Sequence, residues 1–239
     1  MTGRIHSIQV GLPQSEYADC PDNPTQQPWT TGIFKRLTLG PVWLSRNNLA
    51  GDGQADLVHH GGIDKAVCAY PSEHWSHWQS ILPPAQLSGG AFGENFTLDG
   101  LTEKEVCIGD VFSVGSAVVQ ISQPRQPCWK LARRWDIKDL ALQVERTGFT
   151  GWYFRVLQEG TVESNAPFQL MDRPCPEWTI ATANRIMHHD RDNRTAAERL
   201  SLCPLLSASW QHTLRQRCHH QTEADPQQRQ FGNTHSSPS

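Results

Sequence analysis

The chain has 239 residues, which is enough for one large domain or for a medium domain with a small appendage. Its formal net charge of -3 excludes the global basic field of a general nucleic-acid binder. The seven cysteines are odd in number and form no C-x-x-C pair, so they fit neither a disulfide framework nor a structural zinc site. We therefore expect a reducing, cytoplasmic setting. We expect no membrane span, because no segment approaches the required apolar length.

The first fifth of the chain has strand patterns. Apolar and polar residues alternate from Arg4 to Val10, which predicts a half-buried strand. The polar stretch 14–28 is expected to be a surface loop. The apolar residues of 32–49 predict two strands joined by a turn at Gly40-Pro41.

A glycine-rich stretch follows, with the motifs Gly51-Asp52-Gly53-Gln54-Ala55-Asp56 and His60-Gly61-Gly62-Ile63-Asp64-Lys65-Ala66. Four glycines within twelve residues indicate positive φ angles or a close approach of the backbone to a ligand. Such a loop can bind an anion, although tight turns between strands explain the glycines equally well. The adjacent histidines 59 and 60 do not fit the i, i+4 spacing of a helical zinc site.

The middle of the chain alternates strands with short helices. A buried strand is predicted over 66–70. A short helix is predicted to follow it, with Trp75 and Trp78 in the hydrophobic core of the domain. The turn Phe92-Gly93-Glu94-Asn95 precedes another strand. Glu94 is a candidate general acid or base, but a carboxylate at a strand end also commonly caps a turn or pairs with a basic neighbour.

The most informative stretch is Gln123-Pro124-Arg125-Gln126-Pro127-Cys128-Trp129-Lys130. It follows strands predicted over 106–121 and precedes a helix over 129–135. Because the two prolines disfavour helical angles before them, Cys128 is predicted to begin this helix, where the dipole favours a thiolate. A thiolate suits nucleophilic attack or ligation of a soft metal. The alternative is that Cys128 is a small buried residue.

The remaining patterns define the fold class. A helix is predicted over 137–146 and a hairpin around Glu159-Gly160, which brings the total to about eight strands and indicates a closed or nearly closed barrel. Three short helices are predicted over 179–189, 195–202 and 207–218. We expect a mainly β domain over 1–173, a three-helix segment over 174–220 and a disordered tail over 221–239.

These motifs, in this order, resemble the MOSC domain found at the C-terminus of molybdenum cofactor sulfurases. Within that family they are most similar to the YiiM branch, in which a stand-alone MOSC domain precedes a three-helix segment. The resemblance implies a β-barrel, a molybdenum cofactor (molybdopterin) and detoxifying reduction of N-hydroxylated compounds to amines. N-hydroxylaminopurine, hydroxylamines and hydroxyurea are examples. One departure is Ile63, where the family commonly has proline.

The resemblance also assigns residues. It makes Cys128 the molybdenum ligand and a catalytic residue, with His60 and Glu94 as proton donors. The cofactor-binding residues would be His60, Gly61, Gly62, Lys65, Asn95, Gln123, Arg125 and Lys130. The lysines and the arginine offer charge-assisted donors to the cofactor's phosphate, and the glycine turns offer backbone N–H groups.

The implied partners are a small N-hydroxylated substrate and a flavin-type electron-donor reductase. Nucleic acid, membrane and pyridoxal phosphate are not expected, and a homodimer is one expected assembly. Replacing Cys128 with serine should abolish molybdenum retention, and removing residues 221–239 should leave activity unchanged.

Two alternatives stay open at this point. In the first, the chain is a carrier that delivers the cofactor or a persulfide sulfur from Cys128 to a client enzyme. In the second, Cys128 acts with His59 or His60 as a metal-free nucleophile and base.

Overall fold

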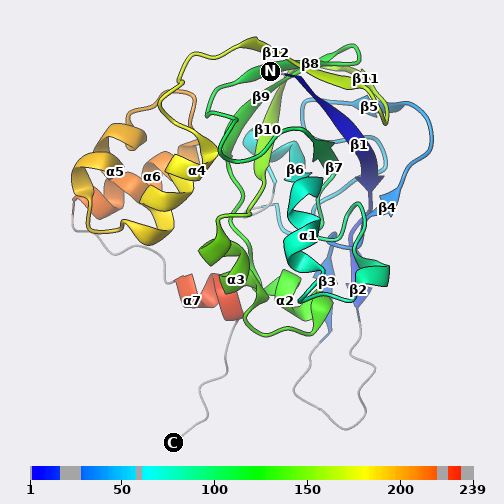
Figure 1. Cartoon of the computed structure of the whole chain (residues 1–239), viewed down its shortest axis with the longest axis horizontal. Helices are drawn as coiled ribbons and strands as arrows, with labels where there is room; N and C mark the ends of the chain where they lie inside the picture. The colour runs from blue at the N-terminus through cyan, green and yellow to red at the C-terminus, as the bar shows by residue number, and fades with distance from the viewer. Residues whose placement is uncertain (1, 17–27, 58–60, 220–225, 233–239) are drawn as a thin grey trace, which may run out of the picture.

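The computed structural model describes residues 2–16, 28–57, 61–219 and 226–232, and its centre is a closed seven-stranded β-barrel (Figure 1). The strands follow the order β12-β8-β9-β10-β6-β7-β1, and pairing of β1 with β12 closes the ring. All neighbours are antiparallel except β6 and β7. The barrel strands are β1 (Thr2–Val10), β6 (Val67–Pro71), β7 (Phe96–Asp99), β8 (Val111–Val114), β9 (Ala117–Pro124), β10 (Trp152–Gln158) and β12 (Pro167–Asp172).

The barrel interior is filled by aromatic side chains from four strands. Phe112, Phe154 and Phe168 contact one another with ring centroids 5.5–6.2 Å apart, and Phe96 joins them. All four rings are fully buried. Since burying one such side chain contributes about 1.5–3 kcal/mol, these rings are a large part of what closes the barrel.

The short outer strands differ from the prediction. β4 (Arg36–Leu37) and β5 (Val42–Leu44) flank the turn at Gly40, but β4 pairs with β1 whereas β5 pairs with β11 (Gly160–Val162). The two strands and the turn predicted over 32–49 are thus present, although the strands do not pair with each other, whereas the hairpin predicted at Glu159-Gly160 is wrong, because β11 pairs with β5 and not with β10. The expected loop 14–28 begins with a strand, β2 (Gln14–Glu16), which pairs with β3 (Trp29–Thr31) directly after the loop, and residues 17–27 lie outside the described part of the chain.

Short helices cover one end of the barrel. They are η1 (Ile63–Lys65), η2 (Ser72–His74), α1 (Trp75–Trp78), η3 (Pro84–Gln86), α2 (Trp129–Trp135) and α3 (Leu140–Thr147). A second apolar cluster lies beneath them and includes Trp78, Phe92, Leu131 and Leu140. This cluster fixes α2 against the barrel, and α2 in turn positions the residues that precede it.

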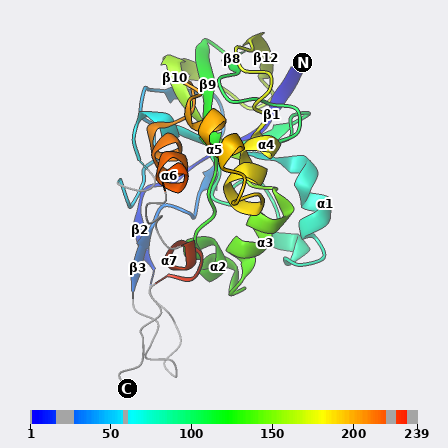
Figure 2. The same cartoon turned by 90° about the vertical axis from the view of Figure 1, so that its left-hand side faces the viewer.

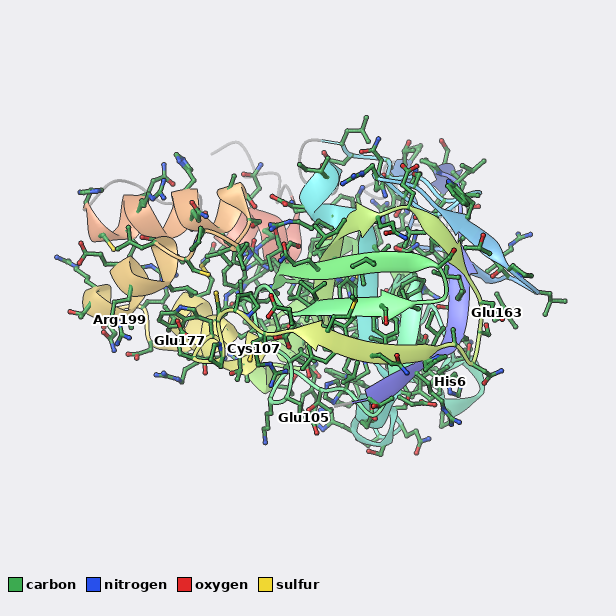
Figure 3. All side chains as sticks on the ribbon, turned by 90° about the horizontal axis from the view of Figure 1, so that it is seen from above. His6, Glu105, Cys107, Glu163, Glu177 and Arg199 are labelled. Carbon is green, nitrogen blue, oxygen red and sulfur yellow. The ribbon has the colours of Figure 1, made fainter. Side chains whose placement is uncertain are left out.

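The three predicted C-terminal helices are present beside the barrel (Figure 3). They are α4 (Ile180–Asn184), which continues as the π-helix η4 (Arg185–His189), then α5 (Arg194–Ser201) and α6 (Ala208–Cys218). The side chains of Thr179, Asn193 and Ser207 cap their N-termini. The segment attaches to the barrel through a β-bridge between Cys107 and Thr179 and a hydrogen bond from Ser207 N to Ser122 O of 2.9 Å.

A further helix lies within the tail that was predicted to be disordered. This helix, α7 (Pro226–Phe231), lies against α2 and α3 in both views of the molecule (Figures 1 and 2). The sequence pattern missed it because its stabilising contacts are polar and come from distant parts of the chain. Among the described residues, no helix is both long enough and apolar enough to cross a bilayer.

Candidate functional site

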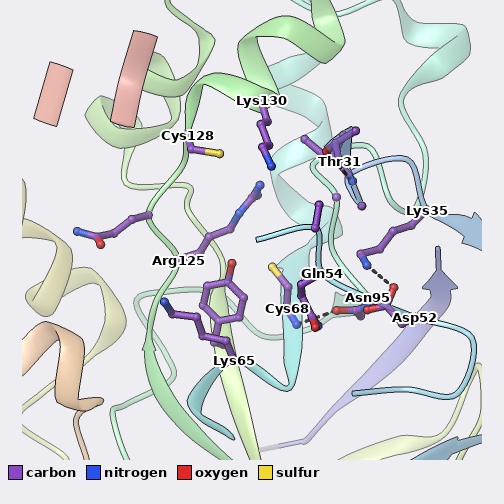
Figure 4. A pocket seen from close by; sticks show the side chains of 17 residues that line it. Thr31, Lys35, Asp52, Gln54, Lys65, Cys68, Asn95, Arg125, Cys128 and Lys130 are labelled. Atoms are coloured by element: carbon purple, nitrogen blue, oxygen red, sulfur yellow. Dashed lines mark hydrogen bonds and ion pairs between the residues drawn. The ribbon is translucent and has the colours of Figure 1, made fainter. Parts of the chain in front are cut away.

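Cys128 stands where the last residues after β9 meet helix α2. The backbone N–H of Arg125 donates to Gly151 O at 3.1 Å, which keeps the chain along the barrel rim just past β9. Cys128 itself has extended angles (φ -130°, ψ 169°) and caps α2 without a capping hydrogen bond from its side chain. The prediction that Cys128 begins the helix is confirmed. Its half-buried thiol points into a pocket (Figure 4).

The pocket lies between the barrel rim, α2 and the glycine-rich loop after β5. Its empty space, counted together with the open mouth, is about 640 Å³. The loop can approach closely because a Cβ at Gly32 would stand 2.6 Å from Gly53 O. The lining residues are Thr31, Gly32, Ile33, Lys35, Asp52, Gly53, Gln54, Ala55, Lys65, Cys68, Gly93, Asn95, Arg125, Gln126, Cys128, Lys130 and Tyr153.

Three cationic side chains reach the pocket near Cys128. Arg125 is only 7 % exposed, and its Nη1 is buried without a hydrogen-bond partner among the described residues. Lys130 donates from Nζ to Thr30 O at 3.1 Å. Burial lowers the pKa of Lys65, an effect that Asp64 and Asp56 partly oppose. Since a guanidinium remains charged in proteins, Arg125 is a buried cation that lines the pocket, and one of its donors has no hydrogen-bond partner among the described residues.

A fourth cation, Lys35, is neutralised by the pocket wall. Its ammonium pairs with Oδ1 of Asp52, and both side chains are almost fully buried. Oδ2 of Asp52 accepts from Asn95 Nδ2 at 2.9 Å, and Oδ1 accepts from Gly11 N at 2.9 Å. Oδ1 of Asn95 also accepts a hydrogen bond from the backbone N–H of Cys68 at 3.1 Å. This network fixes the wall and pairs the charge of Lys35 within it.

Two further neutral groups line the pocket floor. Burial raises the pKa of the Cys68 thiol to about 11, so this thiol is protonated at neutral pH. Burial also raises the pKa of Tyr153 above its ordinary value, so its hydroxyl can donate a hydrogen bond. The pocket thus combines one half-exposed thiol, three cations and two neutral donors.

The structure brings together part of the predicted site. Cys128, Lys65, Asn95, Arg125 and Lys130 all line the pocket (Figure 4). Gly61, Gly62, Glu94 and Gln123 are not among its lining residues, and His59 and His60 lie outside the described part of the chain.

Glu94 and Gln123 have partners away from the pocket. The fully buried Glu94 carboxylate accepts from Gly90 N at 2.7 Å, Phe92 N at 2.9 Å and Thr97 Oγ1 at 3.0 Å. Gln123 donates to Pro124 O and accepts from Ser209 on α6. These contacts shape the turn before β7 and attach the three-helix segment.

Sequence reasoning missed Lys35, Cys68 and Tyr153. Lys35 follows an ordinary loop, and Cys68 and Tyr153 lie inside strands with no motif around them. The apolar run of β6 and the alternation of β10 give no sign that these two side chains point to a pocket. Asp52 and Gln54 belong to a motif that the sequence did single out, without assigned roles.

The described residues do not form a metal site of their own. Among the described residues, no three His, Cys, Asp or Glu side chains lie close enough together to bind an ion. A metal in this pocket would therefore take Cys128 as a protein ligand and its other ligands from an accompanying group. Cys128 with neighbouring cations fits a metal that arrives on an anionic, sulfur-donating cofactor.

Comparisons with known proteins agree with this arrangement. Residues 56–169 match the model of the MOSC domain, and residues 178–221 match the YiiM-like 3-alpha helix domain. The chain is 52 % identical over 206 residues to the uncharacterized protein YflK of Bacillus subtilis, covering 86 % of this chain and 90 % of that one. It is 41 % identical over 218 residues to protein YiiM of Escherichia coli, covering 90 % and 89 %.

The chain belongs to the MOSC-domain family. Within it, the additional helical domain places the chain with the YiiM-like proteins. The crystal structure of YiiM from Geobacillus stearothermophilus superimposes with a TM-score of 0.74 at 40 % identity, covering 90 % of this chain and 99 % of that one. A protein of Gibberella moniliformis called "Reductase" is 34 % identical over 161 residues, which cover 66 % of this chain and 28 % of that one.

Membership in the MOSC-domain family gives the pocket a context. The family connects the fold with the molybdenum cofactor, and the pocket lies where the P-R-x-P-C motif leaves the barrel. The recognised resemblance and the YiiM-like fold are thus confirmed. The roles of individual residues stay predictions.

Proposed function

We propose that this chain is a molybdenum-cofactor-dependent reductase that converts N-hydroxylated compounds, such as N-hydroxylaminopurine, hydroxylamines and hydroxyurea, to amines. The observation that carries the proposal is the pairing of two groups in one pocket. The half-buried thiol of Cys128 can ligate the metal, and the buried Arg125 has an Nη1 without a partner among the described residues. Unused buried donors are rare in folded proteins, so this one is expected to bind an anionic group.

The donor set fits the cofactor. Its phosphate needs charge-assisted donors, and Arg125, Lys130 and Lys65 supply three around the same space. Its metal needs a thiolate, and Cys128 supplies one at the rim. The three cationic side chains that line the pocket would attract the negative charge of the whole group.

When bound, the cofactor supplies the two electrons that, with two protons, convert an N–OH group to N–H and water. The protein binds and orients the cofactor and the substrate, and its side chains provide the protons. Lys65 releases a proton more readily than a solvated lysine because burial lowers its pKa. Tyr153 remains protonated and can donate a hydrogen bond to an oxygen of the substrate. His60 stays a candidate proton donor, and Glu94 is better suited to shaping the turn before β7.

The relatives support the reaction class in general terms. One relative is called "Reductase", and YiiM proteins share both domains of this chain. Regeneration of the reduced cofactor requires an external donor, for which a flavin-type reductase in the cytoplasm is the expected class.

The test is metal analysis of the wild type and three serine variants expressed in a host that makes the molybdenum cofactor. We expect about one molybdenum per chain in the wild type and in Cys218→Ser, which changes a cysteine on α6 away from the pocket. Cys128→Ser should contain none. Cys68→Ser distinguishes the two pocket thiols and should retain the metal.

Loaded wild-type protein should then reduce N-hydroxylaminopurine with a reduced artificial electron donor. Equal molybdenum in the wild type and Cys128→Ser would remove Cys128 as the ligand. Bound cofactor that passes to an acceptor enzyme without any turnover would favour the carrier function instead. Activity in metal-free protein would favour a nucleophilic cysteine.

A further inference from the structure

The C-terminal helix α7 contacts the backbone that carries Cys128. Arg229 on α7 donates from Nη1 to the carbonyl oxygen of Pro127, the residue directly before Cys128. Its other terminal nitrogen, Nη2, donates to Oε2 of Glu145 on α3 at 2.7 Å. One guanidinium thus joins three separate parts of the chain.

Glu145 is a fixed anchor for this arginine. It is 8 % exposed, and Gln230 of α7 donates to both its carboxylate oxygens at 3.1 Å. His188 of η4 approaches Oε1 at 3.4 Å through Nδ1. Burial opposes ionisation, but the bonds and charges of His188 and Arg229 outweigh it and hold the pKa of Glu145 well below its usual range. The carboxylate therefore stays charged and keeps Arg229 in one position.

The segment before Cys128 depends on such outside contacts. Pro124 and Pro127 have no N–H groups, so each can only accept a backbone hydrogen bond, through its carbonyl, and cannot donate one. The Arg229 bond engages Pro127 through its carbonyl, at the point where the extended segment turns into α2. At the other end of α7, the backbone of Gly232 packs on the indole of Trp129, where a Cβ would stand 3.3 Å from the ring.

We propose that Arg229 is a positioning residue that fixes the Pro127–Cys128 backbone, so that the C-terminal helix α7 sets the position of the thiol in the pocket. This inference rests on the proposed function in that Cys128 is taken as the metal ligand. It reverses the sequence-based expectation that residues 221–239 can be removed without effect on activity. Residues that support a metal ligand commonly change metal affinity by about ten- to a hundredfold when mutated.

The first test measures the thiol itself, without metal. Metal-free full-length protein is treated with iodoacetamide, and alkylation of Cys128 is followed by mass spectrometry of its peptide. Because release of the Pro127 carbonyl lets a half-buried thiol reach solvent more often, Arg229→Ala should raise the rate about threefold or more. Arg229→Lys keeps one charged donor and should give an intermediate rate. Gln227→Ala, an exposed change on the same helix, should match the wild type.

A double variant distinguishes the proposed contact from Glu145 through Arg229 to Pro127 from a general loss of structure around Cys128. Glu145→Gln should raise the alkylation rate because it weakens the anchor of Arg229. If the two residues act through one contact, Arg229→Ala with Glu145→Gln should react no faster than Arg229→Ala alone. An unchanged rate in Arg229→Ala, with a wild-type thermal midpoint, would overturn the proposal, as would equal rates for the alanine and lysine variants.

Molybdenum retention provides the second measurement. Arg229→Ala expressed in a cofactor-making host should lose about ten times more of its molybdenum on dialysis than Gln227→Ala does. If wild-type protein binds no molybdenum, the proposed function fails, whereas the alkylation rates still decide the role of Arg229. Faster alkylation with unchanged retention would overturn the link between α7 and the metal site.

Discussion

Lys35 and Asp52 form an ion pair in the pocket wall with side chains only 7 % and 0 % exposed. The same carboxylate accepts hydrogen bonds from Asn95 and from the backbone of Gly11. The pair and its two hydrogen bonds join four segments of the chain, and the pair neutralises one positive charge in the pocket wall. It therefore belongs to the framework of the site, unlike the cations that surround Cys128.

Removing the carboxylate should be costly for the fold. Asp52→Ala leaves the Lys35 ammonium buried without its partner, which typically costs about 3–5 kcal/mol. Urea unfolding of metal-free protein measures the loss. Arg185→Ala is the control, because Arg185 and Asp190 form an ion pair whose side chains are 58 % and 36 % exposed, and such pairs contribute less than about 1 kcal/mol. Similar losses in the two variants would show that the buried pair is not structural.

Arg125 should behave in the opposite way. Arg125→Met removes a buried cation whose Nη1 has no partner among the described residues, so the free energy of unfolding of metal-free protein should change by less than about 1 kcal/mol. Molybdenum and pterin content should fall about tenfold or more, because a charge-assisted contact to the cofactor is lost. Urea unfolding measures the change in stability, and analysis of molybdenum and pterin measures the change in cofactor content. A large loss of stability with full cofactor content would mean that Arg125 serves the fold.

Local patterns predicted most of the barrel and the helix starts. The alternation in Arg4–Val10 and the prolines before Cys128 act over a few neighbouring residues, so their effect can be predicted from the local sequence. The pairing of β5 with β11 depends instead on residues more than a hundred positions apart. Nothing in either short strand specifies its partner, which explains why the hairpin predicted at Glu159-Gly160 was wrong.

The candidate site shows the same division. Arg125, Cys128 and Lys130 share one motif, so the sequence found them together. Cys68 and Tyr153 reach the pocket only because β6 and β10 lie side by side in the barrel. Arg229 was missed for a related reason, since a polar tail shows no apolar periodicity and its helix is stabilised by Glu145, 84 positions away.

Glu94 should prove to be a structural residue. Its carboxylate accepts hydrogen bonds from two backbone N–H groups and from the Thr97 hydroxyl. A glutamine at this position would place its NH₂ group, which cannot accept, next to one or more of these donors. Glu94→Gln should therefore lower the free energy of unfolding by about 1–3 kcal/mol. Steady-state kinetics of the folded fraction, compared with unfolding curves, distinguish the roles. A catalytic acid would instead lose turnover with normal stability.

The cluster around Glu145 predicts how stability depends on pH. Burial outweighs the attraction of Glu145 and lowers the pKa of His188, whereas the bonds to His188 and Arg229 lower that of Glu145 despite burial. Both groups then bind fewer protons in the folded chain than in the unfolded chain, so stability falls as pH falls. The His188 contribution is lost below its unfolded pKa of about 6.5, and the Glu145 contribution is lost below about 4.3.

A variant isolates the histidine. His188→Asn keeps a donor near Nδ1 but does not titrate, so its loss of stability between pH 7.5 and 5.5 should be smaller than that of the wild type by up to about 1.4 kcal/mol. Urea unfolding at the two pH values measures the difference. His212→Asn, an exposed change on α6, should follow the wild type. Equal pH dependence in wild type and His188→Asn would mean that the pKa of His188 is the same in the folded and unfolded chain, since only a difference in its protonation between the two states adds this loss.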